Sequence, residues 1–128
     1  MQYRLLSLLS EVEKAVRAGQ EALGGPPLDS SRMVNFHSGL ARIQLRTVAP
    51  AGTEPRGYIQ LQHFALADGR ACVRAGMGWH GVDLRRSVEI FAAPDVNWTT
   101  EAQRVAEAWL DGPGPSSEPA DRALAASG

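Results

Sequence analysis

The sequence predicts an α+β domain with an N-terminal helix, a four-stranded antiparallel meander sheet and a C-terminal helix, in that order. Three observations lead to this prediction: apolar residues at helical spacing near the start, alternation of apolar and polar residues in the middle, and a second helical stripe before a Gly- and Pro-rich end. Each helix has one apolar stripe, so both helices are expected to pack on one face of the sheet.

The first helix is predicted from one apolar stripe, which comprises Leu5, Leu9, Val12, Val16 and Leu23. Gly19 lies in a gap of this stripe. A glycine inside a helix lowers the stability of the helix by roughly 1 kcal/mol relative to alanine. The last turn is therefore expected to be less stable than the others unless another residue packs closely on it. Glu13 and Arg17 are spaced for an i,i+4 ion pair. Two glycines in a left-handed cap at 24–25, followed by two prolines, end the helix.

The middle of the chain has the alternation of half-buried strands. Residues 28–40 are interpreted as a loop or short turn. A first strand is predicted from Ala41, and a second over 58–66, after the turn-rich segment 49–57. A third strand contains Val73, Ala75 and Met77. The segment SVEIFAA supplies the fourth; its β-branched and aromatic content favours a strand over a competing helix.

The turn LADGRA sets the register of the second and third strands. With a three-residue loop, Ala67 and Asp68 form a type I turn and Gly69 takes the left-handed position. Ile59, Leu61 and His63 then share a face with Met77, Ala75 and Val73, while Gln60 and Gln62 lie with Gly76 and Arg74. A two-residue loop mixes apolar and polar residues on both faces, so the three-residue loop is the prediction.

The second helix is predicted to begin with a capping box made by Thr100 and Gln103. Its apolar stripe is Val105, Ala106, Trp109 and Leu110. Asp111, Gly112 and Pro113 end it. One domain is therefore expected over 1–112, and a flexible polar tail over 113–128.

Composition is that of an ordinary globular domain, with 44% hydrophobic and 21% charged residues and a formal net charge of −1. Residues 32–93 carry eight arginines against four acidic residues, a net of +4, and residues 94–128 carry two against six, a net of −4. Twelve arginines beside one lysine suggest a GC-rich bacterial genome. The apolar run at the start is interrupted by Glu11 and Glu13, which argues against a signal peptide, and no stretch approaches a membrane span, so a cytoplasmic protein is expected.

Residues 76–81, GMGWHG, fit the pattern G-x-G-x-x-G that binds dinucleotide phosphates in many proteins. That site needs a crossover helix after the third glycine, whereas VDLRRSVEI is short and β-prone. Chance is therefore the favoured explanation. The alternative is structural: the Tyr58 ring lies over Gly78 across the strands, and Gly81 lets the chain bend out of the sheet. In a functional version, the missing side chains leave room for a ligand or another chain.

Catalytic and metal-binding candidates are few. His37, His63 and His80 have no spacing that brings two metal ligands together, and the single cysteine, Cys72, excludes a multi-cysteine zinc site, so neither a metal nor another cofactor is expected. His63 is predicted to be a satisfied core histidine, and Cys72 a small buried side chain. His80 and Asp83, with Trp79, form the alternative pocket for a small ligand or an enzyme site, although no catalytic residue is assigned.

The sheet face away from the helices, called the outward face from here on, is the main candidate binding surface. Its predicted members are Arg42, Gln44, Arg46, Tyr58, Gln60, Gln62, Phe64, Arg74 and Phe91, together with Glu89. Arginines among glutamines and aromatics predict a contact with another protein, including a second copy in a homodimer, made by a non-catalytic accessory protein. Single-stranded nucleic acid stacked on the aromatics is the alternative.

Overall fold

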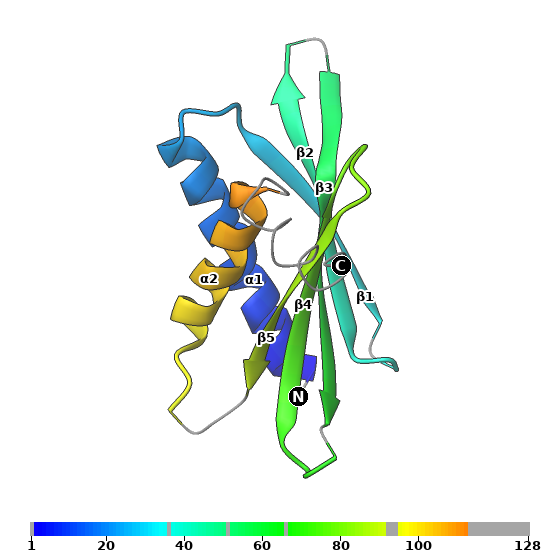
Figure 1. The fold of residues 1–128 in the computed structure, drawn as a ribbon. Helices are drawn as coiled ribbons and strands as arrows, with labels where there is room; N and C mark the ends of the chain where they lie inside the picture. The colour runs from blue at the N-terminus through cyan, green and yellow to red at the C-terminus, as the bar shows by residue number, and fades with distance from the viewer. Residues whose placement is uncertain (1, 36, 51, 66, 92–94, 113–128) are drawn as a thin grey trace, which may run out of the picture.

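The computed structural model describes residues 2–35, 37–50, 52–65, 67–91 and 95–112. They form two layers, an antiparallel sheet and two helices that both lie on one face of it (Figure 1). The elements in chain order are α1 (Gln2–Ala22), β1 (Leu28–Asn35), β2 (Leu40–Ala49), β3 (Gly52–Ala65), β4 (Ala71–Trp79), β5 (Arg85–Phe91) and α2 (Trp98–Asp111). The α+β class and the meander are confirmed, and the predicted tail at 113–128 lies outside the described residues.

The sheet has five strands in the order β1-β2-β3-β4-β5, so the prediction of four strands is wrong. The missed strand is β1, in the segment interpreted as a loop. Its inward positions include Ser30 and Arg32, which face α1 although they are polar. Polar residues on the buried side remove the alternation on which the prediction relied.

Strand β3 also begins earlier than predicted, because Gly52–Gly57 continues it where a loop was expected. A register shift between Leu45 and Arg46 accommodates one extra residue on β3, so that Leu45 pairs with Gly57 and Arg46 with Pro55. Such a bulge lets glycine and proline enter a strand that ideal pairing would exclude. The turn-rich segment is therefore part of a long β2–β3 hairpin, seen at the top of Figure 1.

The register of β3 on β4 is confirmed. Ile59 pairs with Met77, Gln60 with Gly76, and the remaining pairs follow the three-residue-loop alignment. Gly69 has a φ of 89°, which is the left-handed conformation predicted for it. The faces are thereby separated as expected, with apolar side chains of β3 and β4 toward the helices.

The core lies between the sheet and the two helices. Its members from α1 are Leu5, Leu8, Leu9, Val12 and Val16, and from α2 Ala102, Val105, Ala106 and Trp109. The prediction for Leu23 is wrong, because α1 ends at Ala22 and the Leu23 side chain is 71% exposed. Leu110 of α2 packs closely on Gly19, as expected for a glycine inside a helix: a Cβ at Gly19 would overlap Cδ1 of Leu110. The glycine therefore allows the two helices to approach closely.

The N-cap of helix α2 lies three residues before the predicted one. Asn97 is the N-cap, and its side-chain oxygen accepts a hydrogen bond from the Thr100 backbone N–H at 3.1 Å, so Thr100 is a helical residue. The helix is held to β4 by two tryptophans. Trp79 Nε1 donates to the Trp109 carbonyl at 2.9 Å, and Trp109 Nε1 donates to the Gly78 carbonyl at 3.1 Å. The buried indole N–H of Trp109 and the part-buried one of Trp79 thus each have a hydrogen-bond partner.

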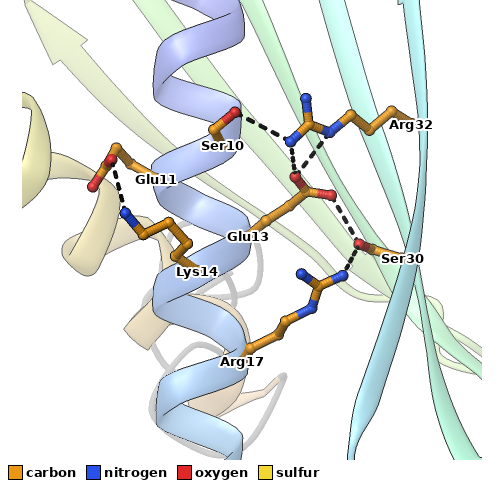
Figure 2. A network of polar contacts seen from close by, with 7 residues as sticks. All are labelled: Ser10, Glu11, Glu13, Lys14, Arg17, Ser30 and Arg32. Carbon is orange, nitrogen blue, oxygen red and sulfur yellow. Dashed lines mark hydrogen bonds and ion pairs between the residues drawn. The ribbon is translucent and has the colours of Figure 1, made fainter.

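Edge strand β1 is attached to α1 by a polar network (Figure 2). Glu13 as a whole residue is only 6% exposed. Its carboxylate accepts two hydrogen bonds from Arg32, one from Nε at 2.8 Å and one from Nη2. Ser30 Oγ donates to Glu13 at 2.8 Å and accepts from Arg17 at 2.9 Å. The predicted direct pair of Glu13 and Arg17 is thus replaced by a contact through Ser30.

Candidate interaction face

The sheet register brings the predicted outward-face residues together. Arg42, Gln44 and Arg46 come from β2, Tyr58, Gln60 and Gln62 from β3, Arg74 from β4, and Glu89 and Phe91 from β5. Their positions alternate with buried ones, as β pairing requires. Phe64 pairs with Cys72 through the backbone, and its side chain lies outside the part of the chain that the structure describes.

Strand β1 extends this face by a row that sequence reasoning missed. Asp29 pairs with Arg46 across the strands, and Met33 pairs with Arg42. Arg46 Nη2 donates to Asp29 Oδ2 at 3.1 Å. This hydrogen bond, with a smaller contribution from the Ser30 backbone N–H, lowers the pKa of Asp29 below its usual value. Met33 adds an exposed apolar side chain, 55% accessible, to the same face.

The opposite side of the face has its own ion pairs. Arg74 donates to Glu89 through Nη2 at 2.7 Å and through Nε at 3.1 Å, between β4 and β5. In the turn before β4, Arg70 bonds Asp68 and also lies over the Phe91 ring, 5.4 Å from its centroid. The backbone N–H and the guanidinium of Arg70 lower the pKa of Asp68. Much of the positive charge on this side is therefore matched by nearby carboxylates.

Tyr58 is the centre of the outward face. The Arg42 guanidinium lies over its ring, 4.1 Å from the centroid, and also donates to Gln60 at 3.4 Å. Arg85, from β5, donates to the Tyr58 hydroxyl at 2.7 Å. Arg85 was absent from the predicted face, because the segment before SVEIFAA had no alternation that placed it on a strand. Its contact with Tyr58 spans β4, which lies between the two strands.

Two glycines of the GMGWHG segment make room on this face in different ways. The Tyr58 ring lies over Gly78, where an added Cβ would come within 2.5 Å of Tyr58 Cε1, as the structural hypothesis expected. An added Cβ at Gly76 would meet nothing within 4 Å. His80 and Gly81 form a turn, and residues 82–84 lead into β5, which pairs antiparallel with β4. The segment therefore lacks the crossover helix and parallel strand of a dinucleotide site.

Cys72 is also on the outward side of β4, opposite Phe91, and it is fully buried. Burial raises the pKa of its thiol, with a smaller contribution from the Glu89 carboxylate. A buried thiol with a raised pKa is a poor nucleophile at neutral pH. The prediction of a small buried side chain is therefore confirmed for Cys72.

The alternative pocket is a groove at the end of β4, with a volume of about 440 Å³. Its lining comprises Glu54, Pro55, Arg56, Trp79, His80 and Val82. The exposed His80 donates its backbone N–H to the Arg56 carbonyl at 2.9 Å, which ties the groove to the base of the β2–β3 hairpin. Asp83 is exposed and outside this lining, so the groove brings together only two of the three predicted residues.

The three histidines lie on different segments: His37 in the turn after β1, His63 on β3 and His80 in the turn after β4. His63 lies on the helix side of β3, as predicted, but its buried Nε2 has no hydrogen-bond partner among the residues described, so the prediction of a satisfied side chain is wrong. His37 is exposed in the turn after β1. Within the described ranges, no group of three or more His, Cys, Asp or Glu side chains is placed to hold a metal ion.

Comparisons with protein-family models, with curated proteins and with solved structures found no match to this chain. No helix in the described part of the chain is long and apolar enough to cross a membrane.

Proposed function

We propose that this protein is a non-catalytic accessory protein that binds another protein, or a second copy of itself, through the outward face. The observation that carries the proposal is the asymmetry of the sheet. The helices cover one face, while the other has large exposed side chains from every strand, including Met33, Gln62 and Phe91. Arginine, tyrosine and methionine are enriched in protein interfaces, and fixed ion pairs reduce the entropy lost on binding.

The ordered side chains of this face support a preformed contact surface. Arg46 is held by Asp29, Arg74 by Glu89, and Tyr58 by Arg85. Side chains that are already fixed in the free protein need less ordering when a partner arrives. A broad surface of five strands is also a better match to the flat interfaces between proteins than to the concave sites of small ligands.

The test compares two double variants. The outward-face variant carries Arg46→Glu with Tyr58→Ala, and the helix variant carries Lys14→Glu with Gln103→Ala at exposed positions of α1 and α2. Each protein, with an affinity tag, is isolated from its source cells and weighed by native mass spectrometry. We expect the wild type and the helix variant to retain a second chain, and the outward-face variant to lose it. Circular dichroism establishes that both variants are folded. Retention of the second chain by a folded outward-face variant would contradict the proposal.

A small ligand in the groove beside Trp79 and His80 is the second candidate, favoured by the groove's volume. The same mass spectra test it, because a ligand that survives purification adds a small mass to the chain. A His80→Ala variant that loses this added mass would support the groove. If neither the wild type nor the His80→Ala variant carries a small added mass, the result would contradict a ligand in the groove.

A further inference from the structure

Among the described residues, two guanidinium groups at the centre of the outward face have no carboxylate partner. Arg42 and Arg85 both contact Tyr58, and neither forms an ion pair with an Asp or Glu in the part of the chain that is described. Arginine stays charged at physiological pH, so both keep a full positive charge. Because the two groups contact the same phenol, their potentials add around it. This is where an anionic group of a partner is most favoured.

Beside these arginines the outward face has no side chain at Gly76, and the open space there is called the depression from here on. Gly76 pairs with Gln60 on β3 and with Ser87 on β5, and the space where its side chain would stand is open. Arg42 is the next residue in this row, opposite Gln60 on β2. Arg85 lies in the adjacent row, opposite Gly78. The depression above Gly76 is thus bordered by two cations, an amide and a hydroxyl.

We propose that this depression binds a carboxylate side chain from an acidic segment of a protein partner. The bordering groups are donors suited to it: guanidinium groups bind carboxylates through charge-assisted hydrogen bonds, and the Gln60 amide and the Ser87 hydroxyl add neutral donors. A glycine in a central strand allows the approaching group to reach the backbone level of the sheet. The inference depends on the proposed function, and it adds the chemistry of the partner.

An acidic protein segment fits this surface better than a nucleic acid does. A strand of nucleic acid would spread several phosphates across the face, where the carboxylates of Asp29, Asp68 and Glu89 lie. It would also need open aromatic rings for stacking, whereas an arginine already lies over each of the two rings described on this face, Arg42 over Tyr58 and Arg70 over Phe91. A short segment with one or two inserted carboxylates needs only Arg42 and Arg85.

The test uses a fluorescein-labelled hexaglutamate peptide titrated with the full chain, followed by anisotropy at about 50 mM salt, where exposed charges are weakly screened. We expect saturable binding that weakens at least tenfold, as ~1.4 kcal/mol would give, in the double variant Arg42→Gln, Arg85→Gln. The control is Lys14→Glu, which changes the net charge by the same two units at an exposed position of α1. It should bind the peptide as the wild type does.

Gly76→Thr is the decisive variant, because it fills the depression without removing charge. The threonine side chain enters open space, so the melting temperature should stay equal to that of the wild type or rise, while peptide binding falls at least tenfold, or ~1.4 kcal/mol. A purely structural role of this site would change the two readouts together. Full peptide binding by folded Gly76→Thr would overturn the proposal.

Three further outcomes would overturn it. The first is absence of hexaglutamate binding by the wild type, and the second is an equal loss in the α1 control, which would indicate general charge attraction. The third is tighter binding of an oligothymidine of about twelve nucleotides, with the same loss in Gly76→Thr, because the occupant would then be a nucleic acid. The proposed protein contact is judged separately, by whether the wild type retains a second chain that Arg46→Glu with Tyr58→Ala loses.

Discussion

Gly76 and Gly78 lie two residues apart on the same face of β4, yet their surroundings differ. Tyr58 packs over Gly78, whereas the space at Gly76 is open. Gly76→Ala should therefore stabilise the protein by about 0.5–1 kcal/mol, because alanine loses less backbone entropy on folding. Gly78→Ala should destabilise it by about 1–3 kcal/mol, since the new methyl group displaces a ring held by two arginines. Urea unfolding of both variants measures the difference, and equal effects would contradict this account.

Asp29 gives the stability a defined pH dependence. Its pKa in the folded protein is below the ordinary value of 3.8, chiefly because Arg46 donates a hydrogen bond to it. Its contribution is therefore complete above the unfolded pKa and lost as the pH falls through the folded pKa. We expect Asp29→Asn to melt below the wild type at neutral pH, and the gap to close as the pH falls from about 5 to about 2.

Melting curves of both proteins across that range measure the effect. Asp83→Asn, at an exposed position outside the ion pairs of the described residues, is the matched control. A gap between Asp29→Asn and the wild type that stays constant across the range would contradict the assignment of the Asp29–Arg46 contact.

At the scale of elements, strand β1 illustrates what alternation can and cannot predict. The strands β2, β3 and β4 were predicted because their inward residues are apolar, as in Ile43, Leu61 and Ala75. In β1, two inward positions are the polar residues Ser30 and Arg32. Both donate hydrogen bonds to Glu13 of α1. When the inward side chains of a strand are polar and bond a carboxylate from a distant part of the sequence, the strand lacks the apolar–polar alternation by which it could be predicted. The same omission concealed the Asp29–Arg46 pair of the outward face.

The network around Glu13 is expected to stabilise β1 locally. Glu13→Gln keeps the shape of the side chain and removes the charge that Arg32 and Ser30 contact, so it should cost about 1–2 kcal/mol. Amide hydrogen exchange should accelerate in β1 more than in β3 and β4. Glu11→Gln, which removes only the exposed pair with Lys14, should cost under about 0.5 kcal/mol. Equal effects of the two substitutions would refute a special role for Glu13.

In the molecule as a whole, the sequence predicted which residues lie on each side of the sheet better than it predicted which of them meet at the candidate site. The β3–β4 register followed from one turn and correctly placed Tyr58 over Gly78. Arg85 was missed because β5 begins two residues before the predicted segment SVEIFAA, where no alternation indicates a strand. The meeting of Arg42 and Arg85 on one tyrosine is a property of several strands together, and single-strand periodicity does not contain it.

If the protein binds its partner through the outward face, the two faces of the molecule must differ in what they contact. The helix layer closes the core, and the outward face is left for a partner. Gln62 and Gln103 offer a matched pair of probes, because both are exposed glutamines, one on β3 and one on α2. A photo-crosslinking amino acid at either position samples one face without changing the net charge.

The most direct measurement is therefore photo-crosslinking in the source cells from Gln62 and from Gln103, with products resolved by mass spectrometry. The account predicts a discrete adduct with a second protein chain from Gln62 and none from Gln103. It also predicts that Tyr58→Ala with Arg46→Glu removes the Gln62 adduct. A discrete adduct from Gln103, with none from Gln62, would contradict the assignment of the outward face as the binding surface.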